Sequence, residues 1–162
     1  MKKHSQSGRV GLFIGRFQPL HNGHLHAIKS ISRQVDLLWI GIGSINKTRS
    51  AHDPFTFRER VWMIHTVLQQ ANIKNYRLFG VRDHTQDSAW VRAIKRKIGR
   101  IDIVFTGNPW TNRCFIQQEY RVKTIQLFEQ ISATKIRDAL QHNHSWTQMV
   151  PPSLHSWLNC HT

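Results

Sequence analysis

The sequence has few acidic residues and few cysteines, and each shortage argues against a class of site. It contains 9 Asp and Glu residues among 162, against 23 Lys and Arg, so its formal net charge is +14. A two-metal site built from aspartates is therefore not expected. Its 2 cysteines, Cys114 and Cys160, lie far apart in no metal-type spacing. They suit a reducing compartment and predict neither zinc binding nor a disulfide framework.

Long apolar runs and several well-known motifs are also missing. No run approaches the length that crosses a bilayer, and residues 1–7 have no apolar signal-peptide core, so we expect a cytoplasmic protein without a membrane partner. No P-loop and no serine nucleophile elbow occur, which argues against P-loop enzymes and hydrolases of that type. The length and a 40% hydrophobic content predict one domain over residues 8–162, after a flexible segment at 1–7.

Apolar runs alternate with amphipathic stretches along the whole chain. We expect strands at residues 10–14, 37–42, 76–81, 101–105 and 121–127, and helices at 22–34, 56–70, 88–98, 111–118, 132–142 and 151–159. A capping box at Thr56 and Glu59 opens the second helix. This order predicts an α/β fold, a Rossmann-like doubly wound parallel sheet, in which ligands bind beyond the carboxyl ends of the strands.

The segment Gly15-Arg-Phe-Gln-Pro-Leu-His21-Asn-Gly-His24 lies between the first strand and the first helix. Helix N-termini offer free N–H groups and a partial positive charge, so they bind phosphates. Both imidazoles can donate hydrogen bonds to phosphate oxygens, more strongly when protonated, and Gly23 lets a phosphate approach the backbone. Metal binding by these histidines is the weaker alternative, because the segment lacks carboxylate and thiolate partners.

A second candidate is Ile131-Ser-Ala-Thr-Lys-Ile-Arg137. Ser132 can cap a helix, Thr134 adds a hydroxyl, and Arg137 lies one turn further along, where it can reach the same anion. Taken alone, this segment would be interpreted as a capped surface helix with solvated charges.

Together, the segments at 15–24 and 131–137 resemble the archaeal-type nicotinamide-mononucleotide adenylyltransferases, which are nucleotidyltransferases with a His-x-Gly-His signature. The resemblance covers roughly residues 8–158. It includes Asp53-Pro-Phe-Thr-x-x-Glu-Arg60, Asp83 followed by Trp90, and Thr106-Gly-Asn-Pro109.

The resemblance implies a role for each matching residue. The catalytic groups would be His21, His24, Arg16 and Arg137, the further ATP contacts Gly15, Phe17, Gly23, Ser132 and Thr134, and the mononucleotide contacts Asp83, Asp87, Trp90 and Asn108. Trp90 would stack on the nicotinamide ring, although a tryptophan in a first helical turn is more often part of the core. No residue is expected to bind a metal directly. Mg²⁺ would be bound mainly through the ATP phosphates, and related enzymes are often homo-oligomers.

The sequence departs from this family at two positions in the expected site. Asp87 stands where the family often has Asn, and His52 stands where it often has Arg. Lys47 and Arg49 are candidates to replace that arginine. Since Asp87 belongs to the expected acceptor site, the reaction type is better supported than the identity of the acceptor.

The expected reaction is in-line attack of the mononucleotide phosphate on the α-phosphorus of ATP, giving NAD and pyrophosphate. The attacking group is already an anion, so catalysis needs positioning and charge stabilisation rather than a general base. Alternatives are another acceptor, of the nicotinate mononucleotide, flavin, pantetheine or cytidine type, or a basic nucleic-acid-binding protein. The charge supports the last alternative, but the intact motifs argue against nucleic acid as the main partner.

Overall fold

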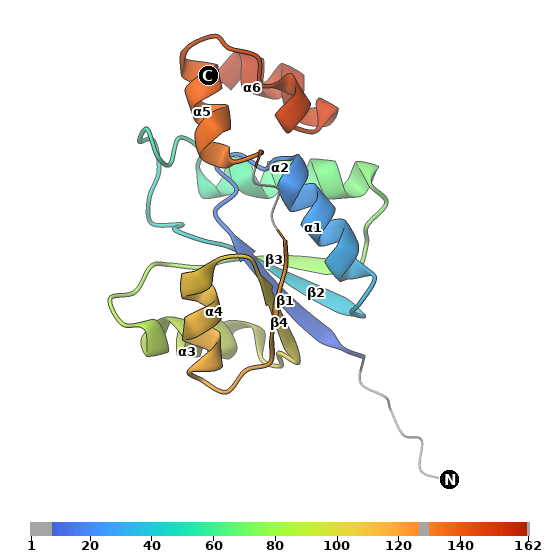
Figure 1. The fold of residues 1–162 in the computed structure, drawn as a ribbon, viewed down its shortest axis with the longest axis vertical. Helices are drawn as coiled ribbons and strands as arrows, with labels where there is room; N and C mark the ends of the chain where they lie inside the picture. Colours follow the sequence, from blue (N-terminus) through green and yellow to red (C-terminus); the bar gives the residue numbers. More distant parts are fainter. Residues whose placement is uncertain (1–7, 127–129, 162) are drawn as a thin grey trace.

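The computed structural model describes residues 8–126 and 130–161, and its centre is a five-stranded parallel sheet (Figure 1). The strand order is β3-β2-β1-β4-β5, with bounds Val10–Gly15 (β1), Leu37–Ile42 (β2), Tyr76–Gly80 (β3), Ile103–Thr106 (β4) and Val122–Thr124 (β5). The predicted α/β doubly wound fold is confirmed. The flexible segment expected at residues 1–7 lies outside the described residues.

Helices cover both faces of the sheet. Helices α1 (Asn22–Ser32) and α2 (Phe57–Gln70) pack on one face, and α3 (Asp87–Ile98) and α4 (Pro109–Ile116) on the other (Figure 1). Helices α5 (Ala133–Gln141) and α6 (His155–His161) extend the first layer, with short 3₁₀ turns at Thr147–Met149 and Pro152–Leu154 between them. Two apolar clusters, one on each side, form the core. No helix among the described residues is long and apolar enough to span a membrane.

Most expected elements are present, and the differences occur at their ends. The capping box is confirmed, since Thr56 Oγ1 accepts from the Glu59 amide at 3.3 Å while the Glu59 carboxylate accepts from the Thr56 amide at 2.7 Å. The fifth strand is wrong in length, because β5 pairs with β4 only as far as Thr124 opposite Thr106, where β4 itself ends. Residue 127 of that prediction lies outside the described residues. The first helix ends at Ser32 rather than at Gln34, and the last helical stretch continues to His161.

The order of the strands determines where a ligand can bind. The chain passes from β1 outward to β2 and β3 and then returns to the other side of β1 as β4, so the strand order reverses between β1 and β4. Loops that leave the carboxyl ends of these two strands diverge to opposite faces of the sheet, which leaves a crevice between them. The residues that follow Gly15 and Thr106 therefore face each other.

Candidate functional site

His21 and His24 form a reciprocal cap at the start of α1. The Nδ1 atom of His21 accepts from the backbone amide of His24 at 3.3 Å, and Nδ1 of His24 accepts from the amide of His21 at 3.4 Å. The two rings stack, with centroids 3.7 Å apart. A neutral imidazole whose Nδ1 accepts a hydrogen bond carries its proton on Nε2. The cap therefore gives each ring an Nε2–H that can donate to an anion.

Both histidines are held in their neutral form. Burial lowers the pKa of His21 from 6.5 to about 4. Burial, and then the adjacent His21, lower the pKa of His24 well below its usual value. Phe17 contributes to this burial, since its ring lies 4.6 Å from the His24 ring. The sequence-based expectation that protonation strengthens these donors does not apply near neutral pH without a bound anion, and the donors are neutral N–H groups.

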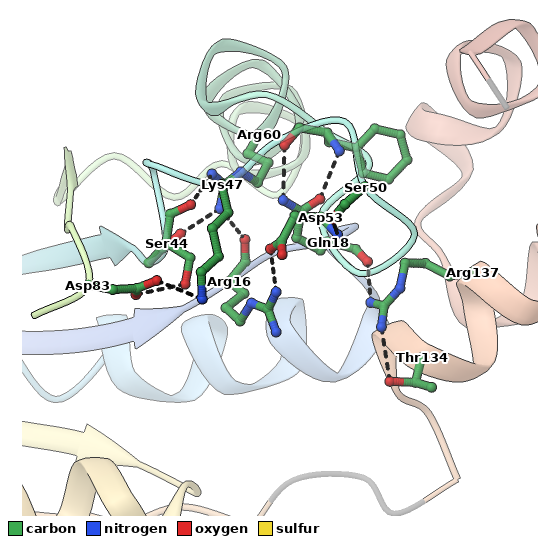
Figure 2. A network of polar contacts seen from close by, with 12 residues as sticks. Arg16, Gln18, Ser44, Lys47, Ser50, Asp53, Arg60, Asp83, Thr134 and Arg137 are labelled. Carbon is green, nitrogen blue, oxygen red and sulfur yellow. Dashed lines mark hydrogen bonds and ion pairs between the residues drawn. The ribbon is translucent and has the colours of Figure 1, made fainter. Parts of the chain in front are cut away.

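Arg137 joins the two sequence motifs, because it reaches from α5 to the loop after β1 (Figure 2). Its Nη1 donates to the carbonyl oxygen of Gln18 at 2.8 Å, and its Nη2 donates to Thr134 Oγ1 at 3.1 Å. Gln18 is buried and exchanges two hydrogen bonds of 2.9 Å with the backbone of Phe55. Ser132 caps α5 as predicted, with Oγ accepting from the Lys135 amide at 3.2 Å. The two motifs thus lie on the same side of the molecule and in contact.

Three arginines surround a single carboxylate beside this contact (Figure 2). Arg16, half exposed, forms an ion pair with the buried Asp53. Burial and then repulsion by Arg16 lower the pKa of Arg137, while Asp53 opposes the shift. Burial also lowers the pKa of Arg60, which Asp53 counteracts. This arrangement has more positive than negative charge and favours binding of an anion.

Arg60, from α2, holds together the loops that follow β1 and β2. Its side chain is fully buried, and its guanidinium donates to the carbonyl oxygens of Arg16 at 2.8 Å, Gly43 at 2.6 Å and Ser44 at 3.4 Å. Its Nε donates to the carbonyl of Thr56 at 3.4 Å. A buried charge is tolerated when its donors are satisfied in this way. Arg60 therefore fixes the loops on which Arg16 and Ser44 lie.

A cavity of about 370 Å³ opens next to the arginine cluster, at the point where the strand order reverses. It is lined by the last two residues of β1 and by residues that follow β1, β2, β3 and β4, namely Ile14, Gly15, Arg16, Gly43, Ser44, Asp83, His84, Trp90, Asn108, Trp110 and Thr111. Three of the four residues expected to contact the mononucleotide, Asp83, Trp90 and Asn108, therefore share one cavity with Gly15 and Arg16.

Asp83 is ionised and held in place at the edge of this cavity. It accepts from Ser44 Oγ at 2.9 Å and pairs with Lys47 Nζ at 3.0 Å. Burial alone would raise the pKa of Asp83, but the hydrogen bonds from Lys47 and Ser44, together with the positive charges of Lys47 and Arg16, lower it. Asn108 is also fixed, because its side-chain oxygen caps α4 by accepting from the Thr111 amide at 3.0 Å.

Trp90 forms the back of the cavity rather than an exposed platform. Its side chain is 5% exposed and packs against Phe115, whereas Trp110 is 40% exposed and lies with its ring centroid 4.7 Å from that of Trp90. Asp87, the fourth residue expected to contact the mononucleotide, is exposed, does not line the cavity and accepts from Trp110 Nε1 at 3.3 Å. Sequence reasoning did not include Trp110, although its position directly after Asn108-Pro109 was a usable signal.

Comparisons with known proteins show the family to which the chain belongs. The model of the cytidylyltransferase-like family matches residues 12–139. The nicotinamide-nucleotide adenylyltransferase of Thermococcus onnurineus is 37% identical over 147 residues, covering 89% of this chain and 79% of that protein. The enzyme of the same name from Methanococcus maripaludis is 38% identical over 140 residues, covering 85% of this chain and 81% of that protein. The chain belongs to the nicotinamide-nucleotide adenylyltransferase family.

A solved structure supports the fold of this family member over almost its whole length. The bifunctional NMN adenylyltransferase/ADP ribose pyrophosphatase from Francisella tularensis, solved with AMP and a manganese ion, superposes with a TM-score of 0.80 at 25% identity. The match covers 94% of this chain and 48% of that longer protein. The resemblance based on the His-x-Gly-His segment is thereby confirmed, as is the assignment to the nucleotidyltransferases.

The ion pairs of Lys47 and Arg49, the two candidates to replace the missing family arginine, differ in position. Lys47 reaches Asp83 at the cavity edge, whereas Arg49 pairs with Glu59 Oε1 at 2.9 Å at the start of α2. His52 is exposed on the same loop. Of these two candidates, Lys47 pairs with a residue that lines the cavity and Arg49 with one that does not, a distinction that sequence alone left open.

No group of three or more His, Cys, Asp or Glu residues within 8–126 and 130–161 is arranged to hold a metal ion. The carboxylates beside the arginine cluster and the cavity, Asp53 and Asp83, are already paired with Arg16 and Lys47. The donor set of the described residues suits an anion better than a bare divalent cation.

Proposed function

We propose that this protein transfers the adenylyl group of ATP to nicotinamide mononucleotide, producing NAD and pyrophosphate. The observation that carries the proposal is the contact of Arg137 with Gln18, beside the cavity that Asp83, Trp90 and Asn108 line. One anion-binding cluster and one acceptor-sized cavity therefore share Arg16. The names of the relatives, nicotinamide-nucleotide adenylyltransferase, support the same substrates.

In this proposal ATP occupies the cluster, with its phosphates between α1 and α5. The Nε2–H groups of His21 and His24 donate to phosphate oxygens, and Arg16 and Arg137 neutralise their charge. Ser132 and Thr134 contact the β- and γ-phosphates at the start of α5. Phe17 is buried, so its side chain supports His24 rather than ATP. Gly15 lines the cavity, and Gly23 is buried in the first turn of α1. Because neither residue has a side chain, a phosphate can approach the backbone at each position.

The reaction is a direct displacement. A phosphate oxygen of the mononucleotide forms a bond to the α-phosphorus while the bond from that phosphorus to the bridging oxygen breaks, and the electron pair leaves with pyrophosphate. No proton has to be removed from the attacking phosphate, so the residues act by alignment and charge stabilisation. ATP enters as its magnesium complex, which supplies additional positive charge at the phosphates. Removal of one donor would cost about 2–4 kcal/mol of transition-state stabilisation.

The decisive experiment supplies ATP with one acceptor at a time and measures pyrophosphate release together with the dinucleotide product. Nicotinamide mononucleotide should give NAD, and nicotinate mononucleotide, flavin mononucleotide, phosphopantetheine and a cytidine-type acceptor serve as comparisons. Absence of NAD in the presence of ATP, Mg²⁺ and nicotinamide mononucleotide would refute the proposal. Faster pyrophosphate release with another acceptor would replace the substrate but keep the reaction class.

A further inference from the structure

The acceptor cavity contains an aromatic side chain that the family resemblance did not assign. Trp110 lies in the first turn of α4 and is 40% exposed while lining the cavity. Trp90, from α3, is 5% exposed and is partly covered by Trp110, at a ring separation of 4.7 Å and an interplanar angle of 47°. The accessible aromatic face at this end of the cavity therefore belongs mainly to Trp110.

Trp110 is held in a fixed orientation by its neighbours. Its indole Nε1–H donates to Asp87 Oδ1 at 3.3 Å, which joins the start of α4 to the start of α3. These two helices lie next to each other on the same face of the sheet (Figure 1). One turn along α4, Cys114 lies beside the same carboxylate. Burial, and then the hydrogen bond to Asp87, raise the pKa of the Cys114 thiol to about 11, so this thiol stays neutral. Asp87 thus interacts with two residues of α4.

The chemistry of the pair suits a cationic aromatic ring. The pyridine ring of a nicotinamide or nicotinate mononucleotide carries a fixed positive charge, and the face of an indole attracts cations more strongly than other aromatic side chains do. A carboxylate that accepts the indole N–H increases the electron density of that ring system. Flavin, cytidine and pantetheine acceptors carry no such fixed charge and would gain less from this contact.

We propose that Trp110 contacts the pyridine ring of the acceptor and that Asp87 is a positioning residue that orients Trp110. This inference rests on the proposed function and specifies its acceptor subsite. Trp90 then forms the rigid back wall against which Trp110 packs. Asp87, an Asn in many relatives by resemblance, is here the partner of a tryptophan rather than a direct contact with the ring.

The test is steady-state kinetics of NAD formation with nicotinamide mononucleotide and ATP varied in turn. Trp110→Leu should raise KM for the mononucleotide about tenfold, the equivalent of about 1.4 kcal/mol, and leave KM for ATP and kcat within about twofold. Trp110→Phe retains an aromatic face and should raise that KM by a smaller factor. The control is Trp62→Leu, because Trp62 is similarly exposed, at 41%, but lies on α2 outside the cavity and packs on Trp157.

Two substitutions at Asp87 separate orientation from direct contact. Asp87→Ala removes the acceptor for the indole N–H and should raise KM for the mononucleotide about fivefold. Asp87→Asn retains an acceptor oxygen and should raise it about twofold at most. Equal losses in both variants would overturn the positioning role. In the double variant Asp87→Ala with Trp110→Leu, the KM increase should match that of Trp110→Leu alone, because the two residues act through one contact.

The outcomes distinguish this inference from the proposed function. A wild-type protein that makes no NAD refutes the proposed function. A wild-type protein that makes NAD, together with a Trp110→Leu variant whose KM for the mononucleotide is unchanged, refutes the inference alone. A Trp110→Leu variant that raises both KM values equally also refutes the inference. If Trp110→Leu loses its cooperative thermal transition in circular dichroism, Trp110→Phe decides: a KM for the mononucleotide equal to that of the wild type counts against the inference, and a selective increase supports it.

Discussion

Mild acid should destabilise this protein through its buried histidine pair. His21 has a pKa of about 4 in the folded state and 6.5 when unfolded. Below 6.5 the unfolded chain binds more protons than the folded one, so the free energy of unfolding falls as the pH drops and levels off below the folded pKa. Between about pH 7.5 and about pH 5, these two values give a loss of about 2 kcal/mol from His21 alone. His24, whose pKa is shifted in the same direction, adds to the loss.

Urea unfolding at the two pH values measures this loss, and His21→Asn isolates the share of one histidine. Asn is a preferred N-cap residue and does not titrate, so the variant should keep α1 capped while its pH-dependent loss of stability becomes smaller by about 2 kcal/mol. Carboxylates and the histidines other than His24 titrate in both proteins and cancel in the comparison, whereas His24 loses the part of its pKa shift that comes from His21 and so adds to the difference. Asn22→Ala is the control, because it removes only the hydrogen bond to Gln148 and should lower stability equally at both pH values. A His21→Asn variant with the pH dependence of the wild type would refute the assignment of a buried neutral histidine.

Three further substitutions test the residues proposed to bind the ATP phosphates and Arg60, which fixes the loop that carries Arg16. His24→Ala should lower kcat by about 10²–10³ with an unchanged circular dichroism spectrum, and a near-normal kcat would contradict its role as a donor. Arg137→Lys keeps the charge but replaces the planar guanidinium, whose two nitrogens donate separately to Gln18 and Thr134, by a single nitrogen, so kcat/KM for ATP should fall about tenfold, whereas an unchanged value would show that charge alone suffices. Arg60→Met leaves buried carbonyls without donors and should lower the free energy of unfolding, measured in urea, by about 3 kcal/mol. An unchanged urea midpoint would contradict the role of Arg60 in holding together the loops that follow β1 and β2.

Sequence predicted best those features that depend on neighbouring residues. The capping box at Thr56 and the cap at Ser132 are each decided within one turn of helix, and both are present. The length of β5 was overestimated because an edge strand can extend only as far as its partner, and β4 ends at Thr106. The apolar residues near 125–127 carry no information about that partner. Register and strand length are set by pairing across the sheet, which a local pattern does not contain.

The residues that support the site were harder to predict, because their partners are distant in sequence. Arg60 and Gln18 look like an ordinary helical cation and a loop amide, yet each is buried and bonded to backbone more than 35 positions away. Lys47 and Arg49 are both basic residues of one loop, so the sequence does not distinguish them. Only the folded loop shows that Lys47 pairs with Asp83 and Arg49 with Glu59. The charge state of the histidines depends on burial by neighbours such as Phe17. These are tertiary effects that spacing cannot reveal.

The excess of basic over acidic residues in the composition is repeated locally in the arginine cluster around Asp53. A protein with few carboxylates can place several guanidinium groups around one Asp53 only if backbone carbonyls and water satisfy the remaining donors, and Arg60 and Arg137 are bonded to carbonyls in this way. Such bonds satisfy donors without cancelling charge, so the cluster keeps a net positive field. An anion with several oxygens supplies both the charge and the acceptors. Burial and then repulsion by Arg16 lower the Arg137 pKa, and in the proposed complex the phosphates would relieve that repulsion and give the cluster its best charge balance.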